Sequence, residues 1–188
     1  MSKYDITFIG HMCYDEIVPF EGETQISPGS AVLQGAIAAA QIGKRVRVIT
    51  KLAKHDHQIL TPLEKRGIDV YTIDSDETSY MQVIHPSENV DERRMVLKHN
   101  AGAFCFQELP ELDTEFVHLA GISDQEFSLD FVQHLNAKGH HLSADLQSFV
   151  RQVDPETSQV FFKDVKNIKE IIALLEKVKL DCVEGEIL

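Results

Sequence analysis

The sequence lacks the features of a membrane or secreted protein. No apolar run among its 188 residues reaches the roughly 18–20 residues that a membrane-spanning helix requires. The first five residues lead directly into a predicted strand rather than into a signal peptide. Three cysteines, Cys13, Cys105 and Cys182, show no metal-binding spacing, and this low, odd count is typical of buried thiols in a reducing compartment. We therefore expect a cytoplasmic protein without a membrane partner.

Positive charge is also scarce. Eighteen Lys and Arg residues stand against 30 Asp and Glu residues, which gives a formal net charge of −12. The nearest approach to a basic block, residues 44–47, alternates with apolar residues as a strand does. Such a chain is a poor match to nucleic acid or to an acidic membrane surface, so neither is an expected partner.

Short catalytic signatures are absent as well. The sequence contains no Gly-x-Ser-x-Gly elbow, Walker loop, Gly-x-Gly-x-x-Gly run or Cys-x-x-Cys pair. His55 and His57 flank Asp56, but no third metal ligand follows at a suitable spacing, and a solvated loop is expected there. Any function must therefore come from residues that lie far apart in the sequence.

What the sequence does contain is a regular alternation of strand and helix patterns. Apolar strands are expected at 6–10, 46–50, 67–73, 116–121, 141–145 and 178–181. Helices are expected at 30–42, 57–66, 123–137 and 166–177, with Ser123–Glu126 as a capping box. This order predicts an α/β fold with a mostly parallel sheet, in one domain spanning residues 1–188.

The middle of the chain follows a different pattern. Residues 80–85 and 94–99 alternate apolar and polar side chains, which is typical of half-exposed antiparallel strands. Together with the arm at 13–27, this hairpin predicts a small sheet standing off the main one. A plain edge hairpin of the same sheet is the alternative.

The helix after Ser27-Pro28-Gly29-Ser30 organises the predicted site. Its residues are small and aliphatic up to Gly43, so it should pack closely against the sheet. Either serine can cap its first free amides, and Gly29 allows a ligand to approach the backbone. A role in packing alone is the competing interpretation.

Polar residues follow several predicted strands at the edge where open α/β sheets bind ligands. They are Asp15, Gly29, Ser30, Asp145 and Asp181. Each aspartate by itself is more often a cap or turn residue than a ligand, so their convergence on one sheet edge carries the argument.

Two further features complete the set. The turn Asn100–Ala103 presents backbone amides or is a plain loop. Asp181 and Glu184 either help to hold a hydrated Mg²⁺ or form a helix cap with a solvated glutamate.

The order and spacing of these motifs resemble the first half to two-thirds of the PfkB (ribokinase-like) carbohydrate kinases. Residues 29–36 stand where the family usually has Gly-Gly-x-x-x-Asn-x-Ala, so Ser30 replaces a glycine and Gln34 the asparagine. The resemblance implies that Asp15, Gly29, Ser30 and Gln34 bind the hydroxyl groups of the acceptor.

Other segments extend the resemblance. The turn with Asn100, Gly102 and Ala103 matches the one that follows the lid strands in the family, which implies further substrate contacts. The segment from Asp145 to Arg151 is similar to inositol-kinase-like members, so these two residues are candidate substrate or phosphate contacts and a polyol is a candidate substrate. The run Asp181-x-x-Glu184 resembles the family's Asn-x-x-Glu motif, which acts on Mg²⁺ and phosphate indirectly, through water.

The resemblance implies a three-layer α/β/α ribokinase-like fold with a small β lid. It also implies ATP- and Mg²⁺-dependent phosphorylation of a sugar or polyol by the complete protein, with a homodimer formed through the lid strands. The family's Gly-Ala-Gly-Asp segment does not occur before Leu188, so we expect a C-terminally truncated chain that is inactive alone. A non-catalytic sugar-binding or regulatory module and an unrelated α/β ligand-binding domain are the alternatives.

Overall fold

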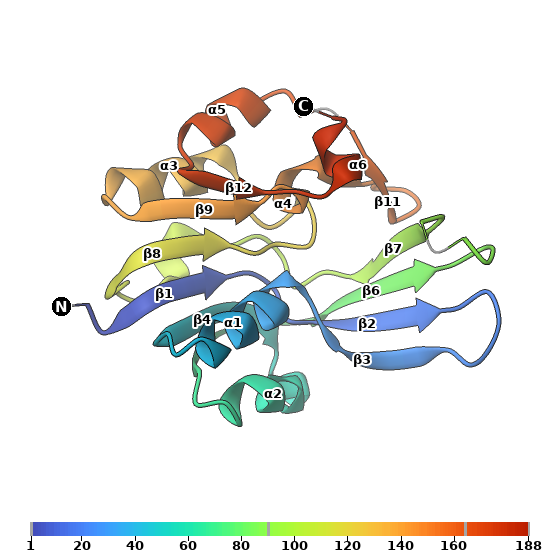
Figure 1. Cartoon of the computed structure of the whole chain (residues 1–188), viewed down its shortest axis with the longest axis horizontal. Coiled ribbons are helices and arrows are strands. Elements are labelled where there is room, and N and C mark those ends of the chain that lie inside the picture. Colours follow the sequence, from blue (N-terminus) through green and yellow to red (C-terminus); the bar gives the residue numbers. More distant parts are fainter. Residues whose placement is uncertain (1, 90, 164, 188) are drawn as a thin grey trace.

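A computed structural model describes residues 2–89, 91–163 and 165–187 of the chain, and they form two six-stranded sheets (Figure 1). The main sheet has the order β12-β9-β8-β1-β4-β5, and every neighbouring pair in it is parallel. Its strands are β1 (Tyr4–Ile9), β4 (Val46–Ala53), β5 (Asp69–Ser75), β8 (Thr114–Leu119), β9 (His141–Asp145) and β12 (Lys177–Lys179). The predicted parallel α/β sheet is therefore confirmed.

Helices cover both faces of the main sheet because its buried strands alternate their side chains between two cores. Phe8 packs with α1 (Ala31–Gln41) and α2 (Thr61–Glu64), whereas its neighbour Ile9 belongs to the core beneath α3 (Leu129–Ala137) and α5 (Ile168–Ala173). The result is the expected three-layer arrangement.

The second sheet extends from the carboxyl ends of the main strands, as Figure 1 shows. Its order is β10-β11-β7-β6-β2-β3, and only the β2–β6 pair is parallel among the described pairs. We call it the lid sheet. Its strands are β2 (Cys13–Val18), β3 (Gln25–Gly29), β6 (Ser79–Ile84), β7 (Arg94–His99), β10 (Arg151–Val153) and β11 (Gln159–Phe162).

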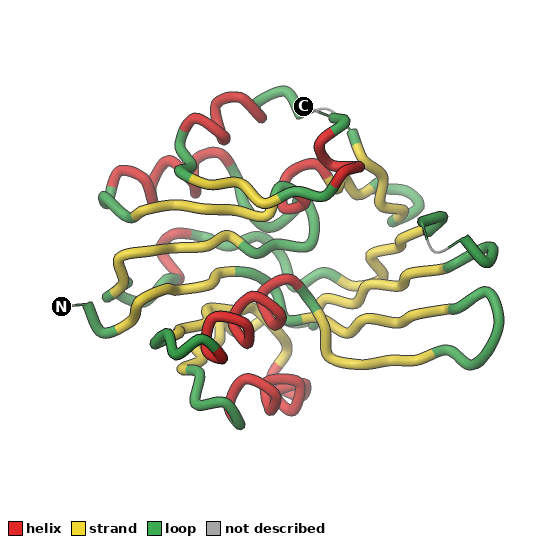
Figure 2. Tube along the Cα trace, in the orientation of Figure 1, coloured by secondary structure: helices red, strands yellow, loops and turns green. Residues whose placement is uncertain are grey.

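Several elements differ from the sequence-based expectation (Figure 2). The helix predicted at 123–137 begins only at Leu129 with Ser128 as its cap, because the Glu126 carboxylate is buried and accepts hydrogen bonds from three backbone amides instead. The predicted 57–66 helix is a 3-10 helix, Lys54–Leu60, followed by the one-turn α2, which begins beside Pro62.

The chain from residue 146 onward also differs. A short helix, α4 (Gln147–Val150), is followed by β10 and β11, which the sequence did not predict. Within the range 166–177, where one helix was expected, only α5 is helical, and Lys177 already belongs to β12. The strand expected at 178–181 is present as β12, and the helix expected after it is the short α6 (Cys182–Gly185).

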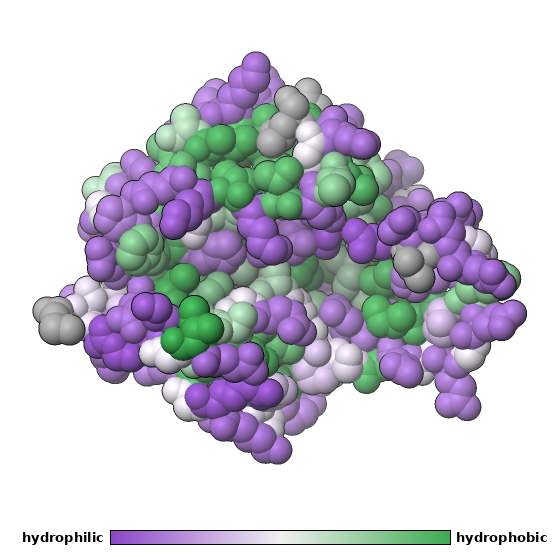
Figure 3. All heavy atoms as spheres, viewed as in Figure 1, coloured by the Kyte–Doolittle hydropathy of each residue, from purple (hydrophilic) through white to green (hydrophobic). Residues whose placement is uncertain are grey.

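Two of the three cysteines differ from the expectation that the thiols are buried. Cys13 is buried as expected, but Cys105 and Cys182 are exposed. In the space-filling view, apolar side chains gather over α5 and α6 (Figure 3), where Leu180 and Val183 are exposed. No helix in the described part of the chain is long and apolar enough to cross a membrane.

Candidate active site

A cleft of about 320 Å³ lies where the lid sheet meets the carboxyl ends of the main strands. It draws residues from β2, α1, β6, β7, α4, β10 and β12. The lining residues are Asp15, Ser30, Ala31, Gln34, Met81, Val83, Arg93, Met95, Ile122, Gln147, Arg151 and Lys179. Four residues predicted from the sequence, Asp15, Ser30, Gln34 and Arg151, are thus brought together.

Asp15 is held in the cleft by close contacts with its own strand and with β3. The Cys13 thiol donates to Asp15 Oδ1 over 3.0 Å, and the Ser30 amide also hydrogen-bonds the carboxylate. Burial raises the pKa of Asp15, while the Cys13 hydrogen bond and the Arg151 charge act in the opposite direction. A Cβ on Gly29 would lie 1.8 Å from Asp15 Oδ2, so the predicted glycine supports the site by leaving room for this carboxylate.

The start of α1 supplies the next part of the site. The Ser30 hydroxyl caps the helix by accepting from the Leu33 amide, so Ser30, rather than Ser27, is the cap. Its backbone has φ 114° and ψ 162°, a region that is essentially restricted to glycine. Gln34 follows one turn later and is exposed to the cleft.

Three cations line the opposite part of the cleft, and each faces a carboxylate. Arg151 Nη2 lies 3.4 Å from Glu184 Oε1, and Lys179 Nζ lies 2.8 Å from Asp145 Oδ1. Arg93 Nη2 lies 3.7 Å from Asp181 Oδ2. None of the three carboxylates is among the residues that line the cleft, so the positive groups are on the inner side of each pair.

The predicted acidic residues therefore stand behind the cleft. Burial by itself would raise the pKa of Asp145, but hydrogen bonds from His118 and Lys179 lower it below its ordinary value. Asp181 caps α6, and the Glu184 side chain accepts from the Asp181 amide in a reciprocal capping box. The expected cap is present, yet Glu184 is buried rather than solvated.

The turn at Asn100–Ala103 lies outside the cleft. Asn100 accepts from the Gly102 amide and donates to Gln125. His11, a fully buried residue that the sequence analysis did not identify, holds this turn through its Nε2, 2.9 Å from the Gly102 carbonyl oxygen. Asn100, Gly102 and Ala103 are not among the lining residues, so the structure does not bring them to Asp15.

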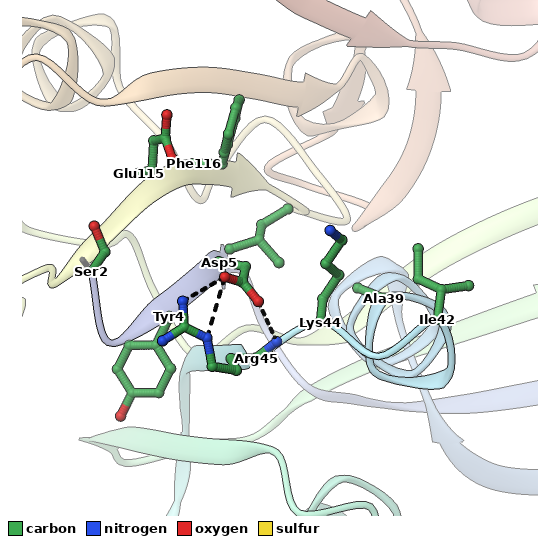
Figure 4. A pocket seen from close by; sticks show the side chains of 10 residues that line it. Ser2, Tyr4, Asp5, Ala39, Ile42, Lys44, Arg45, Glu115 and Phe116 are labelled. Atoms are coloured by element: carbon green, nitrogen blue, oxygen red, sulfur yellow. Dashed lines mark hydrogen bonds and ion pairs between the residues drawn. The ribbon is translucent and has the colours of Figure 1, made fainter.

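Two cavities of nearly twice the volume compete as candidate sites. One of about 610 Å³ lies at the amino ends of β1 and β8 (Figure 4). Ion-paired Asp5 and Arg45 lie in it, with Ile42 and Phe116 at its sides. Another of about 600 Å³ lies at the ends of β4 and β5 and is lined by Lys51, Lys54, His55, Asp74 and others. Neither contains the predicted hydroxyl-binding residues, and the first is at the wrong end of a parallel sheet.

Sequence reasoning missed the two cations at the rim of the cleft and its apolar wall. Arg93 lies in a polar turn of the predicted hairpin, and Lys179 ends a strand whose neighbours were unknown. Met81, Val83 and Met95 could have been identified from the alternation of β6 and β7, but only once the buried face of the lid sheet was known.

No protein-family model and no curated protein matches the chain. Solved structures do. A sulfate complex of a pyrophosphate-dependent kinase in the ribokinase family is 30% identical, with a TM-score of 0.90, over 97% of this chain and 64% of that chain. A complex of such a kinase with a pyrophosphate analog and myo-inositol is also 30% identical, with a TM-score of 0.88, over 97% and 63% of the two chains.

A more distant structure, the Halothermothrix orenii fructokinase, is 16% identical with a TM-score of 0.71, over 98% of this chain and 70% of that one. The chain thus spans just under two thirds of the length of the two pyrophosphate-dependent kinases. Its similarity to ribokinase-family kinases extends over nearly all of its own residues. Together with the parallel sheet, the flanking helices and the lid sheet, this shows that the chain has the ribokinase-like fold.

Proposed function

We propose that the chain belongs to the PfkB (ribokinase-like) family and supplies the acceptor-binding part of a kinase that phosphorylates an alcohol group of a sugar or polyol. The observation that carries the proposal is the convergence of Asp15, Ser30 and Gln34 in one cleft beneath the lid sheet. A half-buried carboxylate accepts hydrogen bonds, and the amide side chain near it both accepts and donates, which is the pattern that vicinal hydroxyls require. The neighbouring structures are ribokinase-family kinases, which supports this interpretation.

Among acceptors, a cyclic polyol of the myo-inositol type is favoured. A 30% identical structure holds myo-inositol, and the cleft is at the small end of the range for ligand sites. Gln34 has the donors and acceptor of asparagine on a longer side chain, which suits a different hydroxyl geometry from that of the usual sugar acceptors.

The phosphoryl donor is either ATP, as the family resemblance implies, or pyrophosphate, as in the 30% identical structures. Residues 1–188 contain no Gly-Ala-Gly-Asp run, so we propose that they bind the acceptor and do not transfer phosphate alone.

The fit of a metal ion to Asp181 and Glu184 is poor. Both Glu184 oxygens already accept hydrogen bonds, from Arg151 and from the Asp181 amide. The described residues form no group of three potential metal ligands. A role of Asp181 and Glu184 toward Mg²⁺ through water stays a prediction.

A homodimer through the lid is the proposed assembly. Strand β3 lies at an edge of the lid sheet, and four of its five residues are exposed, including Ile26. An unpaired edge of this kind is able to add strands from a second copy.

Isothermal titration calorimetry of the 188-residue chain with myo-inositol and with simple sugars tests the proposal. Asp15→Asn keeps the size of the side chain but removes its charge, and we expect binding about 10–100-fold weaker, as for loss of a hydrogen bond to a charged group. The matched control is Glu16→Gln on the same strand, whose carboxylate instead pairs with Lys98.

Equal affinity in both variants, or no polyol binding, would contradict the proposal. Polyol binding without turnover, in a chain that includes any C-terminal continuation and with both donors present, would instead favour a non-catalytic binding module.

A further inference from the structure

Cys13 contacts both the apolar wall of the cleft and its carboxylate, without reaching the cleft itself. Its side chain is fully buried and is not among the lining residues. It packs in the apolar cluster of the lid sheet with Met81, Met95 and Ile122, which do line the cleft. Cys13 therefore supports this wall from the protein interior.

The thiol of Cys13 also contacts the Asp15 carboxylate. The two residues are two positions apart on β2, so their side chains lie on the same face of the strand. Cys13 Sγ lies 3.0 Å from Asp15 Oδ1, and no other described side chain donates a hydrogen bond to this carboxylate. Asp15 Oδ2 lies so close to Gly29 that a Cβ there would be 1.8 Å away. The carboxylate is therefore held between the thiol and the end of β3.

The thiol is the donor in this contact. Burial raises the pKa of Cys13 well above its ordinary value, and the negative charge of Asp15 acts in the same direction. The thiol therefore keeps its proton at neutral pH, whereas an ionised carboxylate only accepts. Cysteine suits this position because it packs as a small apolar side chain and still donates a weak hydrogen bond.

We propose that Cys13 is a positioning residue for the acceptor, because its thiol fixes the orientation of the Asp15 carboxylate while its sulfur packs against the apolar wall. The inference rests on the proposed function and deepens it, since it names a residue that acts on the acceptor only through Asp15. Without the donor, the carboxylate loses the contact that holds Oδ1. The pKa of Asp15 would also rise, because the Cys13 hydrogen bond opposes the effect of burial.

Three substitutions separate the hydrogen bond from the packing. Cys13→Val keeps an apolar side chain and removes the donor, and Cys13→Ala removes the donor without adding volume. Cys13→Ser keeps a donor but places a hydroxyl in the apolar cluster, so its Tm should be lower. In calorimetric titrations of the 188-residue chain with myo-inositol at pH 7.5, we expect binding about 2–10-fold weaker in the valine and alanine variants. The serine variant should bind nearly as tightly as the parent chain.

The pH dependence of binding distinguishes positioning from packing. The acceptor needs an ionised Asp15, so the affinity should fall as the pH decreases through the pKa of this carboxyl group. Between pH 8 and 5, this fall should begin at a higher pH in Cys13→Val and Cys13→Ala than in the parent chain, and Cys13→Ser should restore it. Binding that is weakened by the same factor at every pH would indicate packing alone and would overturn the proposal.

The other groups around Asp15 are the same in all variants. Arg151 on β10 also lowers the pKa of its carboxyl group. Arg93 and Lys179 line the same cleft. The matched control is Cys105→Ser, at an exposed cysteine outside the cleft, and it should leave the affinity unchanged. Thermal unfolding checks that each variant remains folded.

A titration without ligand completes the test. The carboxyl carbon resonance of Asp15, followed by NMR between pH 8 and 4, measures the same pKa, which should be higher in Cys13→Val and Cys13→Ala than in the parent chain. Affinity that is unchanged in both variants across the pH range overturns the positioning role even if myo-inositol binds. Absence of polyol binding by the parent chain refutes the proposed function, and the NMR titration then decides by itself whether the thiol acts on Asp15.

Discussion

Ser30 combines a helix cap with a strained backbone, and the two effects can be separated by substitution. With φ 114° and ψ 162°, this non-glycine residue occupies a region that costs about 1–3 kcal/mol. Ser30→Gly removes that strain and loses only a few tenths of a kcal/mol at the cap. It also raises the conformational entropy of the unfolded chain, which destabilises the folded state by about 0.4–1 kcal/mol. Ser30→Ala keeps the strain and loses the cap, at about 1 kcal/mol.

The glycine variant should therefore be more stable than the alanine variant by about 2 kcal/mol, and at least as stable as the parent protein. For a domain of this size the difference corresponds to about 4–8 °C in Tm. Urea unfolding and thermal unfolding of the three proteins measure it. A glycine variant that is no more stable than the alanine variant would refute the strain argument. Weaker polyol binding by the stabilised glycine variant would indicate that the hydroxyl is retained for ligand contact.

Two further predictions concern residues around the cleft. Gly29→Ala would place a methyl group 1.8 Å from Asp15 Oδ2, so the carboxylate would have to move away. Calorimetry should then find polyol binding at least tenfold weaker, with the fold retained. Unchanged affinity would contradict this role of Gly29. His11 is fully buried, and burial lowers its pKa below the ordinary 6.5, with Glu126 opposing and Lys51 reinforcing the effect. The unfolded chain therefore binds more protons as the pH falls below about 6.5, and the free energy of unfolding should decrease by up to about 1.4 kcal/mol per pH unit. Urea unfolding between pH 7.5 and 5.5 measures this slope, which should be smaller in His11→Asn; equal slopes would exclude His11 as its source.

The sequence predicted the fold well because the fold depends on local periodicity. The apolar strands and the small, aliphatic helix after Ser30 are specified by patterns a few residues long, and the structure has them at nearly the predicted positions. The predicted start of the helix at 123 was wrong because a tertiary hydrogen bond outweighed the local capping pattern. Glu126 matches the third position of a capping box, yet its carboxylate accepts from the amide of His11, 115 residues away.

The site was predicted only in part for the same reason. Asp15 lies on β2, and Gly29 and Ser30 lie at the end of the neighbouring strand β3, so their proximity follows from the β2–β3 pairing. Arg93 and Lys179 reach the cleft only through the packing of the lid sheet against β12, and no local pattern marks them. The turn at Asn100 resembled a ligand loop, but His11 and Ser79 bind its backbone.

A crystal structure of the chain with myo-inositol would show whether this cleft binds a polyol. We expect ring hydroxyls within hydrogen-bond distance of the Asp15 carboxylate and the Gln34 amide, with Arg93, Arg151 and Lys179 on the opposite side of the cleft. A ring bound instead in the cavity at the ends of β4 and β5, or no bound ring at saturating concentration, would contradict it.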